Sequence, residues 1–230
     1  MIIFNKSYKT PEENLAIDEY LLQEVNKGNY ADGICRIWES PHLFVVLGLS
    51  KKIEDDVNND SCKRDSIPIL KRCSGGGTVL QGPGCFNYSF ILPMSYAKEL
   101  KSLTNTTTFI LQLVKKTLSK ALNNIELKGI SDLTINDVKF SGNAQRRLKN
   151  AILFHGTILY DFDLGLISDY LKEPPVQPEY RKNRPHQSFI QNITITKKEL
   201  TQLFSNLSTS NMPLSVTTIP EKYLIKYKYL

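Results

Sequence analysis

The chain has 230 residues, of which 41% are hydrophobic, and it carries a formal net charge of +6. This length and composition fit one large folded domain and exclude a disordered chain. No run of about 18 apolar residues occurs, which excludes a membrane-spanning helix. The N-terminus becomes polar too early for a secretory signal peptide, so we expect a cytoplasmic protein.

Charge and cysteine content narrow the class of protein further. A positive surface attracts acidic partners, but the basic residues are dispersed along the chain, which argues against nucleic acid. The four cysteines show no C-x-x-C spacing. We therefore interpret them as reduced thiols and predict neither a disulfide framework nor a metal site.

The N-terminal third begins with a clear helix signal. Thr10, Pro11 and Glu13 occupy the N-cap, N1 and N3 positions that favour a helix start, and apolar spacing continues the helix to about residue 27. The elements predicted to follow are strands over 34–39 and 44–49 and a short surface helix over 54–65.

The middle and the end of the chain alternate between strands and helices. An amphipathic helix is predicted over 104–123 from its apolar spacing, and the prolines within 172–188 predict an irregular loop. Further strands are predicted over 67–70, 78–93, 125–128, 132–135 and 151–160, and further helices over 161–171 and 196–206. Strands in the middle flanked by helices indicate an α+β fold.

The strongest chemical signal is three consecutive glycines, Gly75 to Gly77, which follow Arg72 and Ser74. Glycine tolerates positive φ and carries no Cβ, so such a triplet can turn its N–H groups inward around an anion. An arginine can grip phosphate with two hydrogen bonds. The chain matches neither a Walker A loop nor a dinucleotide-binding fingerprint. We therefore predict a site for a phosphate-bearing molecule of another kind, with apolar side chains such as Val79 beside it.

A second polar cluster follows at Lys139, Ser141 and Gly142. A lysine beside a Ser-Gly bend is suggestive, because glycine lets another group approach the backbone closely. His155 lies on an otherwise apolar strand. By itself it would be more typical of a hydrogen-bonded core histidine than of a catalyst, so we predict no acid–base role for it.

Three motifs occur in order along the chain: Arg72 to Gly77, Lys139 to Arg147, and His155 to Thr157. Together they resemble the motifs of lipoate–protein ligases and their octanoyltransferase relatives, and the resemblance extends over about 10–205. It implies the class II biotin and lipoate ligase catalytic-domain fold, a mixed and mostly antiparallel sheet with flanking helices. We therefore predict a single catalytic domain over 1–230.

The resemblance implies an activity. In such ligases the carboxylate of lipoate or octanoate attacks the α-phosphate of ATP, pyrophosphate leaves, and the acyl group passes from acyl-AMP to a lysine of a carrier domain. Magnesium is expected with ATP, although no metal ligands can be assigned from the sequence. The implied partner is a lipoyl carrier protein or domain, and a basic surface would suit an acidic one.

The resemblance also implies a role for each motif residue. Lys139 would be the catalytic residue, because a compact ammonium can follow the negative charge from carboxylate to phosphate to tetrahedral oxyanion. The residues implied in nucleotide binding are Arg72, Gly77, Thr78, Val79, Leu80 and Lys139. Those implied in acyl binding are Ser74, Gly75, Gly76, Gly77, Lys139, Ser141, Gly142, Asn143, Ala144, His155, Gly156 and Thr157.

Two departures from the family pattern leave alternatives open. The ligases usually have His-Asp-x-Gly-Asn after the glycines, whereas this chain has Gln81-Gly82-Pro83-Gly84-Cys85, which puts the handling of metal and pyrophosphate in question. About 25 residues follow residue 205, too few for the C-terminal accessory domain of full-length bacterial ligases. We therefore predict no such domain, and a separate accessory ligase subunit becomes a candidate partner.

Two other functions compete with the ligase. An ATP-independent octanoyl or lipoyl transferase would form a thioester on a cysteine, for which Cys85 is the candidate nucleophile. We favour the interpretation that Cys85 is a packing residue beside the glycines. A non-catalytic homologue that binds an acylated carrier is the third reading. The retained Arg72, glycine triplet and Lys139 argue against it.

Overall fold

The computed structural model describes residues 1–210, 214, 216 and 218–227. Its largest element is a seven-stranded sheet with the order β1-β2-β6-β10-β9-β8-β7, in which every neighbouring pair is antiparallel except β1 and β2. The strands are β1 (Ile2–Asn5), β2 (Ile34–Trp38), β6 (Cys85–Pro93), β7 (Ile125–Lys128), β8 (Asp132–Ile135), β9 (Val138–Arg147) and β10 (Ala151–Leu159). The predicted α+β fold with a mixed, mostly antiparallel sheet is confirmed.

A second, three-stranded sheet carries the glycine triplet. Its order is β4-β3-β5, with β3 at Phe44–Leu47, β4 at Ile69–Lys71 and β5 at Val79–Gln81. The single strand predicted over 78–93 is therefore wrong, since β5 and β6 belong to different sheets. The reason is the turn between them. Gly84 has φ +88°, and a Cβ there would lie 2.3 Å from the carbonyl carbon of Asp161.

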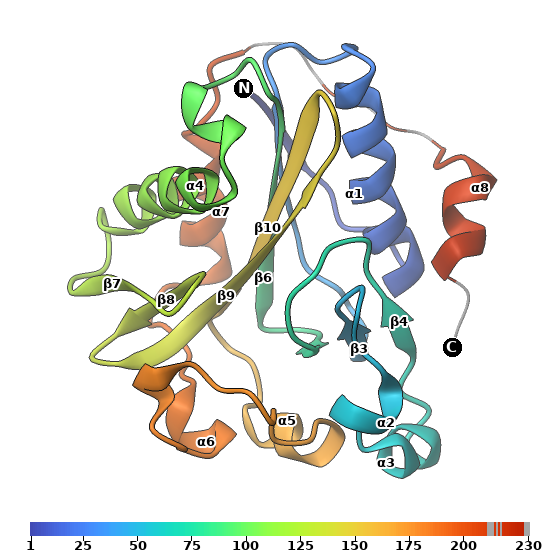
Figure 1. Cartoon of the computed structure of the whole chain (residues 1–230), viewed down its shortest axis with the longest axis vertical. Coiled ribbons are helices and arrows are strands. Elements are labelled where there is room, and N and C mark those ends of the chain that lie inside the picture. Colours follow the sequence, from blue (N-terminus) through green and yellow to red (C-terminus); the bar gives the residue numbers. More distant parts are fainter. Residues whose placement is uncertain (211–213, 215, 217, 228–230) are drawn as a thin grey trace.

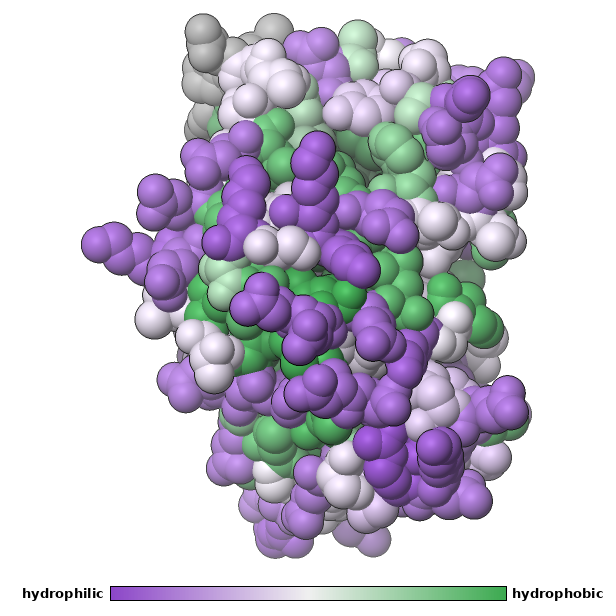
Figure 2. Space-filling view, turned by 90° about the vertical axis from the view of Figure 1, so that its left-hand side faces the viewer, coloured by the Kyte–Doolittle hydropathy of each residue, from purple (hydrophilic) through white to green (hydrophobic). Residues whose placement is uncertain are grey.

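Helices cover both faces of the large sheet (Figure 1). Helix α1 (Pro11–Asn26) packs on one face, and α4 (Leu103–Leu118) and α7 (Lys197–Ser205) pack on the other. Because side chains alternate along a strand, Tyr88 of β6 joins the apolar core under α4 and α7. Its neighbour Ser89 points to α1. Figure 2, which views the side of α4, shows apolar surface between polar side chains.

The predicted helices are confirmed in place but differ in length. The capping box of Thr10 and Glu13 begins α1 as expected. The helix predicted over 54–65 is two short helices, α2 (Ile53–Asp56) and α3 (Asn59–Arg64). Between them Val57 is extended and forms a bridge to Leu171. Helices α4 and α5 (Gly165–Tyr170) are shorter than predicted.

The end of the chain holds more regular structure than the sequence predicted. The segment predicted as an irregular loop over 172–188 contains a 3-10 turn, Glu179–Arg181, and helix α6, His186–Phe189. Beyond α7, the predicted last helix, lies α8 (Glu221–Leu224). It packs on α1, where the rings of Tyr20 and Tyr223 are 5.5 Å apart. None of the helices in the described part of the chain has the length and apolar character needed to cross a bilayer.

Candidate active site

The loop that carries the glycines is braced from inside by Arg72. We call residues 74–77 the glycine loop. The guanidinium of Arg72 donates to the Ser74 hydroxyl (3.0 Å) and to the carbonyl oxygens of Gly75 (2.7 Å) and Gly77 (2.8 Å). Burial lowers the pKa of Arg72 to about 10, so the side chain is still cationic at neutral pH. Arg72 therefore fixes the shape of the loop and places a positive charge beneath it.

Two glycines allow the loop to lie close to its neighbours. Gly76 has φ +89°, and a Cβ there would lie 2.9 Å from Nη2 of Arg72 and 3.4 Å from Cβ of Ala144. A Cβ on Gly48, at the end of β3, would lie 2.1 Å from the Gly76 carbonyl oxygen. A side chain at Gly48 would therefore displace the glycine loop from its position against the end of β3. The same geometry brings the glycine loop against β9.

Lys139 lies on the side of β9 that faces the glycine loop. Its Nζ is next to Gly142, where a Cβ would be 2.9 Å away. Gly142 and Ala144 share a face by strand alternation, and Ala144 touches the loop at Gly76. The ammonium is 2.8 Å from Oδ1 of Asp132, and 27% of the Lys139 side chain is exposed. The structure thus brings the first two sequence motifs together on one surface.

The third motif is divided between the two faces of the large sheet. His155 pairs with Ala144, and Thr157 pairs with Gly142, so both lie on the glycine-loop side. Gly156 lies on the opposite side, where a Cβ would be 1.9 Å from Oδ1 of Asn143.

The polar atoms of Asn143 are already engaged inside the protein. Its Oδ1 accepts from the Tyr88 hydroxyl, and its Nδ2 donates to the Ser131 carbonyl oxygen at 2.8 Å. Ser141 is buried, and its hydroxyl accepts from Asn143. Of the residues implied in acyl binding, Ser141, Asn143 and Gly156 therefore face α4 and α7 instead of the glycine loop.

His155 links the glycine loop to α1. Its Nε2 is 2.6 Å from the Ser74 hydroxyl, and its Nδ1 is 4.0 Å from Asp18. Because the Ser74 oxygen already accepts from Arg72, we assign its hydrogen to the bond with Nε2, which puts the ring proton on Nδ1. Burial, with the nearby charge of Arg72, lowers the pKa of His155 to about 4. The ring is therefore neutral at pH 7 and orders the loop, in keeping with a structural role.

This lowered pKa predicts a pH-dependent stability. An unfolded histidine has a pKa near 6.5, whereas His155 in the folded protein has a pKa of about 4. Between these two pH values the unfolded chain is protonated at this residue and the folded chain is not, so the fold loses stability as the pH falls. The stability present above pH 6.5 should therefore decrease by about 2 kcal/mol by pH 5. Chemical denaturation above pH 6.5 and at pH 5 measures this change in the free energy of unfolding. The substitution His155→Gln should remove most of the pH dependence. An equal pH dependence in the variant would contradict the assignment.

A buried polar network on α1 supports the histidine, and sequence reasoning missed it. Arg36 of β2 is fully buried and donates to Asp18 (2.7 Å) and to Oδ1 of Asn14 (2.7 Å). The second oxygen of Asp18 accepts from Ser89 at 2.6 Å. The available signal was two polar residues four apart on the apolar face of a helix, together with an arginine inside an apolar strand.

The residues after the glycine loop divide into surface and core. The Thr78 hydroxyl donates to Asp56 at 2.6 Å. Val79 is 37% exposed, whereas Leu80 is buried in the core of the small sheet. Leu49, whose N–H donates to the Ser74 carbonyl oxygen, is 47% exposed. Val79 and Leu49 therefore supply apolar surface beside the loop, and only the backbone of Leu80 could reach a ligand.

The stretch 81–85, which departs from the family pattern, is buried except for the exposed Pro83. Gln81 donates to the Thr157 hydroxyl, which donates in turn to Oδ1 of Asn87, both at 2.6 Å. Cys85 is fully buried, and burial raises the pKa of its thiol. All four cysteines are free, as predicted. A buried thiol that resists ionisation is a poor nucleophile, so the packing interpretation of Cys85 fits the structure.

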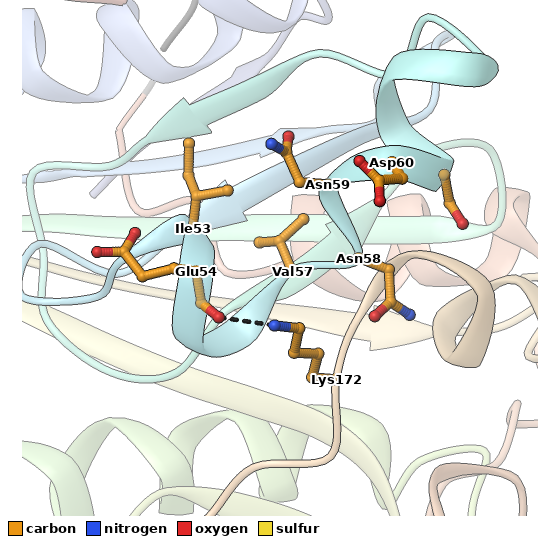
Figure 3. Close-up of a pocket in the computed structure, with 8 residues that line it drawn as sticks. Ile53, Glu54, Val57, Asn58, Asn59, Asp60 and Lys172 are labelled. Carbon is orange, nitrogen blue, oxygen red and sulfur yellow. Dashed lines mark hydrogen bonds between the residues drawn. The ribbon is translucent and has the colours of Figure 1, made fainter.

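A pocket of about 730 Å³ lies between α2, α3 and the segment that follows α5. Lys172 closes one side of it and donates to the Glu54 carbonyl oxygen at 2.7 Å (Figure 3). Its lining contains none of the residues that the sequence motifs singled out.

The fold and the paired motifs define a class of protein, α+β domains in which a glycine loop on a small sheet lies beside a lysine on a large, mostly antiparallel sheet. Residues 10–207 match the model of the lipoyl protein ligase A/B catalytic domain, and the chain belongs to this family. The chain is 32% identical over 165 residues to the protein named "Probable lipoate-protein ligase A" of Mycoplasma pneumoniae, covering 70% of this chain and 46% of that protein. The chain spans about half the length of the curated relatives it matches.

Two solved structures share the fold. The bipartite lipoate protein ligase of Thermoplasma acidophilum, studied with its E2 lipoyl domain, has a TM-score of 0.79 at 20% identity and is covered to 90%, with 98% of this chain aligned. A lipoate-protein ligase A with bound ATP has a TM-score of 0.76 at 19% identity, with 98% of this chain and 92% of that chain covered.

Proposed function

We propose that this chain is the catalytic domain of a lipoate–protein ligase. It activates lipoate or octanoate with ATP as acyl-AMP and passes the acyl group to a lysine of a lipoyl carrier domain. The observation that carries the proposal is the position of the Lys139 ammonium, on the same surface as the Arg72-braced glycine loop. A cation and a glycine-rich backbone turn on one surface suit an acyl phosphate, which carries both a carbonyl and a negative charge.

Lys139 has the central chemical role in this proposal. In the first step an acyl carboxylate oxygen bonds to the α-phosphorus and pyrophosphate leaves. In the second, the amine of the carrier lysine bonds to the acyl carbon and AMP leaves. Negative charge develops on phosphate oxygens and then on the carbonyl oxygen, and an ammonium beside both positions stabilises each transition state.

Arg72 supports the nucleotide mainly through the loop. Its guanidinium donates hydrogen bonds to the Ser74 hydroxyl and to the carbonyl oxygens of Val46, Gly75 and Gly77. A guanidinium has five N–H groups. A direct contact with phosphate would therefore use the remaining N–H or replace one of these bonds. Apolar surface for the acyl chain comes from Val79 and Leu49 beside the loop.

ATP and magnesium enter the proposal together. The structure of a related ligase with bound ATP supports ATP as the nucleotide. Within the described residues no group of three or more metal-ligating side chains occurs. Magnesium in phosphoryl-transfer sites is held largely by the substrate phosphates and water, so the ion fits here as part of the ATP complex. An ATP-consuming reaction also suits the expected cytoplasmic location.

The proposed partners are a lipoyl domain and an accessory subunit. The Thermoplasma acidophilum ligase is bipartite and belongs to a lipoylation system with an E2 lipoyl domain, which supports both. The net charge of +6 suits an acidic carrier.

Pyrophosphate exchange tests the proposed function. The protein mixed with ATP, lipoate or octanoate and labelled pyrophosphate should return label to ATP only when the acid is present. The assay is run with and without a lipoyl domain, since adenylation requires no carrier. Absence of exchange, together with an acyl thioester found on Cys85 by mass spectrometry after mixing with octanoyl-carrier, would replace the ligase with the transferase. Burial of the Cys85 thiol favours acid-dependent exchange over a thioester on Cys85.

A further inference from the structure

The carboxylate that holds Lys139 is itself held by a tyrosine from a distant segment. Oδ1 of Asp132 is 2.8 Å from the Lys139 ammonium, and Oδ2 accepts from the Tyr180 hydroxyl at 2.7 Å. Asp132 is the first residue of β8, whereas Tyr180 belongs to the proline-rich segment 172–188. The two oxygens of the Asp132 carboxylate thus join this segment to the proposed catalytic residue, Lys139.

The proline-rich segment is braced in a way that fixes Tyr180. Arg181 is 3% exposed, forms an ion pair with Glu173, and donates to the Arg184 carbonyl oxygen at 2.8 Å. Arg184 donates to the carbonyl oxygen of Asp137 (2.8 Å), in the turn between β8 and β9. The segment is therefore attached to the hairpin that carries both Asp132 and Lys139.

The ring of Tyr180 is located independently of its hydroxyl. It lies 5.3 Å from the ring of Phe189, centroid to centroid. On another side it meets Gly129, where a Cβ would be 3.2 Å from Cε1 of Tyr180 and where φ is +58°. Removing the hydroxyl should therefore leave the ring in place, so its contribution can be measured alone.

We propose that Tyr180 is a positioning residue for Lys139 and acts through Asp132. This inference rests on the proposed function. A carboxylate that accepts from a hydroxyl has one fixed orientation and shares part of its negative charge with the donor. Asp132 then holds the ammonium in place without neutralising it fully, so Lys139 keeps attraction for phosphate. Without the Tyr180 hydroxyl the Asp132 carboxylate would attract the ammonium more strongly, and it would hold the ammonium in more than one position.

Tyr180→Phe tests this role. We expect kcat of lipoate-dependent pyrophosphate exchange to decrease about tenfold, the range of one hydrogen bond to a charged group. The KM values for ATP and lipoate should change less than about twofold, because the glycine loop and Arg72, the other proposed contacts of the nucleotide, are left unchanged. Tyr170→Phe is the matched control, since the Tyr170 hydroxyl donates to Asp65 at 3.0 Å away from Lys139. It should leave kcat unchanged.

A double-mutant cycle separates positioning from structure. Asp132→Asn should lower kcat, and adding Tyr180→Phe to it should cause little further loss, because the hydroxyl acts through the carboxylate. Wild-type kcat in Tyr180→Phe, equal losses in the Tyr170 control, or multiplying effects of the two substitutions would overturn the inference. If the wild type shows no exchange, the proposed function fails instead. The positioning is then judged from the rate at which an acylating reagent modifies Lys139, which Tyr180→Phe should slow.

Discussion

Lys139→Ala should lower the rate of acyl-adenylate formation by roughly 10²–10³-fold, the usual cost of removing one charge-stabilising contact from a transition state. The ammonium lies beside Gly142, on the same face as the glycine loop, and alanine leaves the developing charge without a partner there. Pyrophosphate exchange measures the first step, and transfer from added lipoyl-AMP to a lipoyl domain measures the second. Both should decrease.

Lys128 provides the control for this substitution. It also pairs with carboxylates, those of Glu126 and Asp137, and its side chain is 27% exposed, as is that of Lys139. Lys128→Ala should keep both rates near those of the wild type. Full activity in Lys139→Ala would remove the basis of the ligase proposal, and equal losses in the two variants would point to a general effect of surface charge.

Asp18→Ala should destabilise the fold by about 3–5 kcal/mol, because it leaves a buried guanidinium without its counter-charge. Arg36 is fully buried, and its Nε has no hydrogen-bond partner even in the intact protein. Asp18 also accepts from Ser89 and lies 4.0 Å from His155. The same change should therefore loosen the support of the glycine loop. Urea denaturation gives the stability, and exchange activity reports on the loop.

Glu24→Ala is the comparison on the same helix. Glu24 pairs with Lys27, whose side chain is largely exposed, and such surface pairs contribute at most about 1 kcal/mol. A loss in Asp18→Ala no greater than that of Glu24→Ala would show that the buried network is not what holds α1 to the sheet.

Local signals in the sequence were enough to place most elements. The capping box at Thr10 and the apolar spacing after it define α1, because both depend on residues within a few positions. The break between β5 and β6 was missed, since it depends on how closely Gly84 approaches the backbone of Asp161, a residue far along the chain. Turn chemistry alone did not reveal that the two strands join different sheets.

The site was predicted as a set of motifs but not as a geometry. The three motifs, taken in their order along the chain, predicted Arg72, Lys139 and His155 as site residues. The structure places all three on one side of the large sheet. Which residues of β9 face that side could not be read from alternation, because a bulge opposite Leu133 and Thr134 shifts the register. The link from Tyr180 to Asp132 spans 48 residues and carries no local signal.

The two halves of the site belong to separate sheets. The glycine loop connects β4 and β5 of the small sheet, whereas Lys139 lies on β9 of the large one. The two sheets meet at the Ser74–His155 and Gln81–Thr157 hydrogen bonds, both 2.6 Å long. A nucleotide that touches both halves would add contacts across this junction, so its binding would also stabilise the two sheets against separation.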